Sequence, residues 1–337
     1  MLKRRLVRYY LERVISTFAV FFVTISAIFV LWRLLPGNPI LAYVTAMQQQ
    51  YSYYSPEMLR VIDNYKKTFN LEGDLLTQYI NFIRELFLHG NLGPSFLRFP
   101  KPAQELIAEA IPWTIGLLAL STAIAWALGV TIGGLVGWLR EKRVATVLYA
   151  MSVFLSQVPS YMMAVILVLF FGYIWAILPF QGAYSPALKP GLYLEFIVDV
   201  IRHGILPALS IIVVNLFGWI LSTRSLVVSI MGEDYLTFAE AKGLRKFRIF
   251  KRYIMRSSLL PQITALGMQL GFTVNGSVLI ESIFLYPGIG RLLTLAITYK
   301  DYNVINGCII LSSGLVLFAN LLLELVYPLI DPRIERW

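Results

Sequence analysis

Six stretches of the chain contain no Asp, Glu, Lys or Arg and are long enough to cross a lipid bilayer as helices. They cover residues 14–32, 111–139, 144–188, 204–223, 257–280 and 302–323. A transmembrane helix needs about 20 mostly apolar residues to cross the hydrocarbon layer. The pattern therefore predicts an all-α integral membrane protein with six transmembrane helices.

The third stretch, residues 144–188, is too long for a single span and contains Pro159 and Pro179. Proline lacks a backbone N–H and kinks or ends a helix. We expect one long helix that is kinked near Pro159 and ends before Pro179. Two short helices are the alternative, although neither half would comfortably cross the bilayer.

These spans divide the chain into five parts. We expect a cytoplasmic N-terminus over residues 1–13, a first transmembrane helix over 14–35 and an extracytoplasmic insertion over 36–110. A five-helix core over 111–331, with a cytoplasmic loop at 232–256, and a cytoplasmic tail over 332–337 complete the chain. The first apolar stretch is longer than the core of a signal peptide and lacks a small-residue cleavage site, so it is expected to remain as a helix.

The insertion carries helix signals of its own. Ser55, Pro56 and Glu57 are typical of a helix start. Residues 74–88 place five apolar side chains on one helical stripe, and Gly90 follows where a C-terminal cap would lie. The stripe consists of Leu75, Tyr79, Phe82, Ile83 and Leu86. A small helical subdomain outside the membrane is therefore expected.

Glycines at intervals of four predict close contacts between spanning helices. Gly129, Gly133 and Gly137 lie in the second stretch, and Gly267 and Gly271 lie in the fifth. Small residues at this spacing let two helix backbones approach each other. We interpret these glycines as packing residues rather than as functional ones.

Composition and charge agree with a membrane location. The chain is 58% hydrophobic and only 14% charged, against about 25% charged residues in a typical soluble domain. With the N-terminus inside, the expected cytoplasmic pieces hold 18 of the 29 Lys and Arg residues. This bias matches the positive-inside rule, so the net charge of +10 does not indicate nucleic-acid binding.

The residues offer little for catalysis or metal binding. Cys308 is the only cysteine, which excludes an intramolecular disulfide and a multi-cysteine metal site. The two histidines, His89 and His203, are isolated in sequence from acidic or cysteine clusters. No phosphate-binding loop of the Gly-x-x-x-x-Gly-Lys-Ser/Thr type is present, so we expect no ATP site of that kind. A membrane-embedded enzyme would need a clustered nucleophile, base or metal site.

The cytoplasmic loop at 232–256 has an unusual pattern. Asp234 is suited to a helix start, residues 235–242 are long enough for about two turns, and Gly243 can take the left-handed conformation that stops a helix. A basic helix then leads into the fifth span. A short helix tied to two spanning helices suits mechanical coupling to a soluble partner, with Ala239, Ala241 and Gly243 as small contact surfaces. From composition alone, a basic loop held inside by its charge remains the alternative.

This loop resembles the signature loop of ATP-binding-cassette (ABC) importer permeases of the dipeptide, oligopeptide and nickel class. The core Ala239-Glu240-Ala241-Lys242-Gly243-Leu244 is followed by a basic helix and by Leu259-Leu260-Pro261. Further elements resemble the family in the expected order: residues 34–39, 90–95, 281–292, 300–302 and 331–333. Two departures are Glu240, which separates the paired alanines of the wider family, and Asn91, which replaces an aspartate. In residues 40–70 we identify no motif of the family.

The resemblance implies a permease that is not itself an enzyme. Such a subunit pairs with a second, usually different, permease in the plasma membrane, and two partner ATPase subunits bind ATP and magnesium inside. An extracytoplasmic binding protein delivers the substrate. The residues implied to couple to the ATPases are Asp234, Tyr235, Ala239, Glu240, Ala241, Lys242 and Gly243. Glu240 and Lys242 could pair with charges on the partner.

Candidate residues of the translocation path are polar side chains near the fifth span. Gln269, Asn275 and Ser277 could line the path, because polar groups facing lipid are costly. They could equally form hydrogen bonds to neighbouring helices. Glu281 at the outer end belongs to the same candidate set, and the resemblance favours a structural or gating role for it.

Substrate and mode of action leave alternatives open. Permeases of this class carry short peptides, nickel or, in some thermophiles, oligosaccharides; peptides are the first expectation and oligosaccharides the second. A stand-alone carrier or channel is the competing class. Ion-coupled carriers usually place ionisable groups or broken helices near the midplane. The charge-free windows argue against an ionic relay, whereas Pro159 and Pro207 leave room for broken helices.

Overall fold

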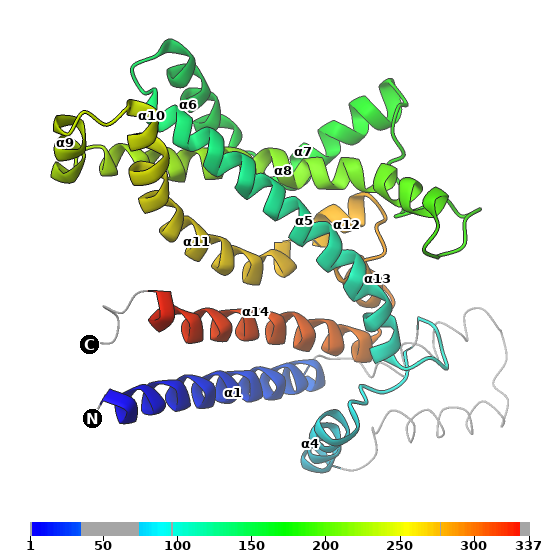
Figure 1. The fold of residues 1–337 in the computed structure, drawn as a ribbon. Coiled ribbons are helices and arrows are strands. Elements are labelled where there is room, and N and C mark those ends of the chain that lie inside the picture. Colours follow the sequence, from blue (N-terminus) through cyan, green and yellow to red (C-terminus); the bar gives the residue numbers. More distant parts are fainter. Residues whose placement is uncertain (1, 35–73, 96, 277, 331–337) are drawn as a thin grey trace, which may run out of the picture. The chain divides into compact units, whose positions relative to one another are not determined.

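A computed structural model describes residues 2–34, 74–95, 97–276 and 278–330 (Figure 1). Within these ranges all secondary-structure elements are helices. The only β-type pairing there is an isolated bridge between Pro94 and Pro102. The chain forms two compact units, residues 1–112 with 288–337 and residues 113–287. The all-helical architecture confirms the all-α part of the predicted fold class.

The first unit contains two long helices that lie side by side, α1 (Leu2–Leu34) and α14 (Tyr302–Ile330) (Figure 1). The predicted amphipathic helix is present as α4 (Leu75–Arg84) with a π-helical turn, η1 (Glu85–His89). Gly90 caps it in the left-handed conformation, as expected.

The apolar stripe of α4 and η1 packs against these long helices for most of its length and is partly buried there. Phe82, Ile83 and Leu86 pack on a cluster formed by Ile25, Ile28 and Ile310. Tyr79 shares a hydrogen bond of 2.6 Å with Ser26. Leu75, the first residue of the stripe, remains 59% exposed. The suggested helix start at residues 55–57 lies outside the described residues.

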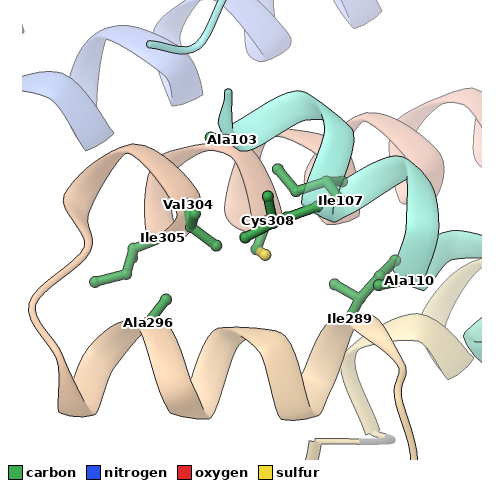
Figure 2. Packing of buried hydrophobic residues seen from close by; sticks show 9 residues of the cluster. Ala103, Ile107, Ala110, Ile289, Ala296, Val304, Ile305 and Cys308 are labelled. Carbon is green, nitrogen blue, oxygen red and sulfur yellow. The ribbon is translucent and has the colours of Figure 1, made fainter. Parts of the chain in front are cut away.

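A second core joins α13 (Ile289–Thr298), α14 and the beginning of α5 (Ala103–Trp138) (Figure 2). Ala103, Ile107 and Ala110 face Ile289, Ala296, Val304 and Ile305, and Figure 2 shows the Cys308 thiol enclosed among them. Helix α5 begins at Ala103, within the region expected to be an insertion. The charge-free window started later, at residue 111, because Glu105 and Glu109 precede it. Acidic side chains in the first turns are nevertheless compatible with a helix.

The second unit is built from seven α-helices with π-helical segments, in addition to the rest of α5. They are α6 (Arg143–Leu155), α7 (Ser160–Leu167) continued by η2 (Val168–Ile174), α8 (Leu194–Ile230), α9 (Asp234–Ala241), α10 (Lys246–Ile249) continued by η3 (Phe250–Ile254) and α11 (Met255–Gly276), and α12 (Val278–Ile283).

The glycines of α5 lie where that helix crosses α8. A Cβ atom added to Gly129 would come within 2.4 Å of Trp219 Cβ, and one added to Gly133 within 2.7 Å of the Ile220 carbonyl oxygen. At Gly137 the nearest atom is Cγ1 of Val227, at 2.7 Å. The two backbones therefore approach too closely for any larger residue, as the spacing of four predicted.

The expectation that residues 144–188 contain one long helix, kinked near Pro159 and ending before Pro179, is wrong. Helices α6 and α7–η2 are separate and meet at an angle of 98°. Residues 156–158 form a turn in which Gln157 and Val158 donate backbone hydrogen bonds to Phe154 and Leu155. Pro159 then precedes α7 with an extended backbone. A kinked helix would retain most of its hydrogen bonds, whereas here the helix ends and a new one starts.

Four helices in the described part of the chain are long and apolar enough to cross a membrane, and the bent α6–α7 pair could supply a fifth span. The four cover Tyr9–Leu31, Ala103–Trp138, Leu194–Ile230 and Tyr302–Leu322. Helices α11 and α12 cover the fifth predicted window on either side of Ser277. These spans support a membrane protein, while the count of six stays a prediction.

Candidate functional site

The loop after α8 folds into the two-turn helix that the sequence predicted. Helix α9 ends at Ala241, and Gly243 takes a left-handed conformation with φ of 72°. The Leu244 N–H donates to the Ala239 carbonyl at 3.3 Å, and the Gly243 N–H donates to the Glu240 carbonyl at 2.8 Å. This pair of bonds is the Schellman motif, which stops a helix and turns the chain.

The start of α9 differs slightly from the prediction. Glu233, not Asp234, occupies the N-cap position, and it makes no side-chain capping hydrogen bond. Asp234 is instead the first helical residue, where its negative charge interacts favourably with the positive end of the helix.

One face of α9 is anchored to its own unit. Leu236 and Ala239, three residues apart, are buried with Val227 of α8 and with Ile249, Phe250 and Ile254 of α10–η3; this cluster is called the α9 core below. Trp138 at the end of α5 stacks on Phe250 with ring centroids 4.7 Å apart. Ala239 is therefore part of this core. The expectation that it offers a contact surface is wrong, because residue 239 shares its helix face with Leu236.

The other face of α9 is exposed and carries two aromatic rings. Tyr235 is 41% exposed and Phe238 is 70% exposed. Glu240, Ala241 and Lys242 are also exposed, and neither charged group forms an ion pair with any described residue. We call Tyr235, Phe238, Glu240, Ala241 and Lys242 the α9 surface. Two exposed aromatic rings one helical turn apart, with polar neighbours, form the kind of patch that marks a partner-binding surface.

Phe238 was missed by the sequence analysis, although the signal was present. It lies three residues after Tyr235 and therefore on the same helix face. In sequence it also lies between Leu236 and Ala239, the two residues that mark the buried side of the helix. A helix with apolar residues on both sides is more apolar than anchoring alone requires.

The candidate path residues are less completely described. Gln269 is half-buried on α11. The backbone of Asn275 belongs to the same helix, but its side chain lies outside the described residues, as does Ser277 altogether. These positions stay candidates from the sequence.

Glu281 is fully buried on α12. Thr114 Oγ1 of α5 donates a hydrogen bond of 2.8 Å to Glu281 Oε1. Phe284 and Tyr286, which follow α12, are buried in the neighbouring apolar cluster, and burial with the nearby Glu281 charge raises the pKa of Tyr286 to about 12. The burial and the bond to α5 favour the structural or gating role among those considered.

Two motifs far apart in sequence form a buried polar cluster in the first unit, which we call the Asp301 cluster. Ser95 Oγ and the Leu97 N–H donate to Asp301 Oδ2 at 2.5 and 3.0 Å. Asp301 Oδ1 accepts from the Val304 N–H at 3.2 Å and so caps α14. Asn303 Nδ2 donates to the Pro94 carbonyl at 2.9 Å. Both motifs were identified in the sequence, but their contact was not predicted.

The histidines are less isolated than the sequence suggested. His203 Nδ1 lies 3.5 Å from Asp199 Oδ2, and His89 Nδ1 lies 3.5 Å from Glu85 Oε1. Both pairs are four residues apart on a helix, a spacing that brings side chains together. Within the described residues no group of three or more His, Cys, Asp or Glu side chains could hold a metal ion.

Comparison with known proteins identifies the kind of chain that carries this loop. Residues 129–336 match the family of binding-protein-dependent transport system inner membrane components. A probable peptide ABC transporter permease protein of Sinorhizobium fredii is 32% identical over 97% of this chain and 99% of its own length. The oligopeptide transport system permease protein AppB of Bacillus subtilis is 30% identical over 77% of this chain and 81% of its own length. The chain therefore belongs to the binding-protein-dependent inner membrane components, the permease subunits of ABC importers.

Proposed function

We propose that this chain forms half of the translocation path of an oligopeptide importer in the cell membrane. The other half is a second, homologous permease, in the manner of a heterodimer. Two ATPase subunits bind ATP and magnesium on the cytoplasmic side, and an extracytoplasmic protein delivers the substrate. Relatives similar over almost the whole chain are named as peptide permeases, which supports peptides over oligosaccharides or nickel.

The α9 surface is the observation that carries the coupling part of this proposal. The rings of Tyr235 and Phe238 are exposed on a short helix, and the opposite face of that helix is buried in the α9 core. A push on Phe238 is transmitted to α5, α8 and α10–η3 because all of them contribute to that core. Tyr235, Glu240, Ala241, Lys242 and the Gly243 turn complete the proposed ATPase contact.

The proposed orientation has six spans with both termini in the cytoplasm. The charge bias of the loops supports it, and it places α9 on the side where ATP is available. A single cysteine introduced at Phe238, in a Cys308→Ser background, should react with a membrane-impermeant thiol reagent only in inverted vesicles. Reaction at Phe238→Cys in right-side-out vesicles would contradict the orientation.

Purification in mild detergent from the native membrane tests the assembly. Recovery of one related permease and two ATPase chains in stoichiometric amounts is the expected result. Recovery of this chain alone, under conditions that preserve other complexes, would contradict the importer assembly. The accompanying binding protein is then titrated with short peptides and with oligosaccharides of similar mass. Tight binding of oligosaccharides without binding of peptides would overturn the substrate assignment.

A further inference from the structure

A strongly basic surface follows α9 and is not explained by the α9 contact. It comprises Lys246, Arg248, Lys251, Arg252 and Arg256 on the continuous helical run formed by α10, η3 and the first turn of α11. All five side chains are exposed, and none forms an ion pair with a residue in the described ranges. Five uncompensated positive charges within eleven residues repel one another unless an anionic partner is present.

The helical run that carries these cations also contributes to the α9 core. Ile249, Phe250 and Ile254 are buried in the α9 core. The five cations lie outside this core, and their side chains stay exposed. A cluster of cations directly before a span, here the fifth predicted one, is the arrangement that attracts anionic phospholipid headgroups.

Two aromatic residues are interleaved with the cations. Phe247 is 63% exposed and Tyr253 is 37% exposed. Aromatic side chains are enriched at the boundary between headgroups and acyl chains, where one part of the ring is apolar and the surroundings are wet. A free inorganic anion would account for the charges but not for an exposed phenylalanine beside them. The combination favours a lipid surface.

We propose that this basic surface binds anionic phospholipid headgroups of the cytoplasmic leaflet. Lipid binding would thereby restrain α10–η3, the helical run on which α9 packs. The side of the membrane rests on the orientation given under the proposed function. The link to α9 is direct, because Ile249, Phe250 and Ile254 pack against Leu236 and Ala239. Anionic lipid should therefore strengthen the coupling of ATP hydrolysis to transport.

Lipid retention by the purified full chain tests the binding step without any partner. The chain is exchanged into mixed micelles of phosphatidylglycerol and phosphatidylcholine, and retained lipid is measured by native mass spectrometry. Preferential retention of phosphatidylglycerol is expected. In Lys251→Gln/Arg252→Gln the affinity for phosphatidylglycerol should fall roughly 25-fold, about fivefold for each cation removed from the lipid surface. Equal retention of the two lipids by the unmodified chain would overturn the proposal.

Two matched variants separate lipid binding from a general effect of charge. Lys251→Arg/Arg252→Lys keeps both charges and should retain phosphatidylglycerol as the unmodified chain does. Lys189→Gln/Lys300→Gln removes two exposed cations from the other proposed side, and it should also leave retention unchanged. Excess inorganic phosphate should not displace the lipid. Loss of retention in the second variant, or displacement by phosphate, would show that the basic surface is not a headgroup site.

The assembled importer tests the consequence and separates this inference from the proposed function. In bilayers containing phosphatidylglycerol, the Lys251→Gln/Arg252→Gln complex should transport less per ATP hydrolysed than the unmodified complex, and in pure phosphatidylcholine the two should be equal. Loss of the ATPase subunits from this variant in lipid-free detergent would make the surface an ATPase contact and overturn the lipid assignment. Retention of phosphatidylglycerol by a chain that recruits no ATPase would defeat the proposed function while leaving lipid binding intact.

Discussion

The Asp301 cluster and the α9 surface are both built from short motifs that resemble the same family, yet they differ in how their polar and apolar groups are satisfied. In the Asp301 cluster the carboxylate is fully buried and accepts from Ser95, Leu97 and Val304. On the α9 surface, Phe238 is largely exposed to solvent and Glu240 and Lys242 have no ionic partner among the described residues.

This difference distinguishes a motif that maintains the fold from one that binds a partner. A buried carboxylate is stable only when its hydrogen bonds are made, so the Asp301 cluster is complete within one chain. An exposed aromatic ring gains free energy only when something covers it. The same kind of sequence signal can thus mark either role, and burial decides between them.

Removing the carboxylate of Asp301 should have the largest effect. In Asp301→Ala the donors of Ser95 and Val304 lose their acceptor, the Leu97 N–H keeps only its bond to Ser95 Oγ at 3.1 Å, and α14 loses its cap. Destabilisation of about 3 kcal/mol is expected, from roughly 1 kcal/mol or more for each of the two unsatisfied donors and about 1 kcal/mol for the bond that Leu97 loses. Thermal unfolding of the purified chain in detergent measures it.

Two variants complete the Asp301 test. Asp301→Asn keeps one carbonyl oxygen and should lose less stability than Asp301→Ala. Glu105→Ala removes an exposed carboxylate in the same unit and should change the unfolding temperature little. Equal melting of Asp301→Ala and Glu105→Ala would show that the cluster does not maintain the fold.

The contact between α5 and α8 should give the next largest effect, because it underlies the α9 core. In Gly133→Ala the new methyl group would lie 2.7 Å from the Ile220 carbonyl oxygen and 2.9 Å from the Ile220 Cα, both backbone atoms that cannot move aside without shifting α8. Overpacking of this kind costs roughly 1–3 kcal/mol. Gly116→Ala, in the same helix but with open space around it, should be neutral. Similar unfolding temperatures for the two variants would contradict close packing of α5 on α8.

Truncating Phe238 should weaken assembly and spare the fold. In Phe238→Ala the affinity for the ATPase subunits should fall by about 2 kcal/mol, or roughly 30-fold, as is typical of a central aromatic contact. Phe250→Ala is the matched control, because Phe250 is buried in the α9 core and stacked on Trp138. That variant should unfold at a lower temperature. Normal ATPase recovery with Phe238→Ala would show that the α9 surface is not the docking site.

Much of the membrane architecture could be predicted from the sequence because it follows from run lengths of apolar residues. The windows at 14–32, 111–139, 204–223 and 302–323 each coincide with a single long helix. The predicted helix starts were less accurate, because each window was ended at the first charged residue. Helices α5 and α8 begin well before their windows, since Glu and Arg side chains are compatible with a helix outside the apolar layer. The break before Pro159 was not predicted, because proline is compatible with either a kink or a helix end. Only the structure shows that the turn at 156–158 ends the helix.

The functional surface was predicted in outline but not in its details. The length of α9 and the role of Gly243 as its stop follow from local chemistry, and both were predicted. Which alanine is buried depends on contacts with Ile249 and Ile254, which no local pattern specifies. The same holds for the Asp301 cluster, where Ser95 and Asp301 are separated by more than 200 residues.

Replacing Gly243 should have a small effect on stability and a specific effect on coupling. Its φ of 72° is strained for a residue with a side chain, by roughly 1–2 kcal/mol, although no atom lies within 4 Å of an added Cβ. Gly243→Val should therefore leave insertion and ATPase binding intact but alter the turn after α9, so that ATP is hydrolysed without matching uptake. Gly243→Asn, which tolerates the left-handed conformation, and Gly232→Ala should both stay coupled. Coupled uptake by Gly243→Val would contradict the role of this turn, and failure of Gly232→Ala would show that the loop as a whole is sensitive.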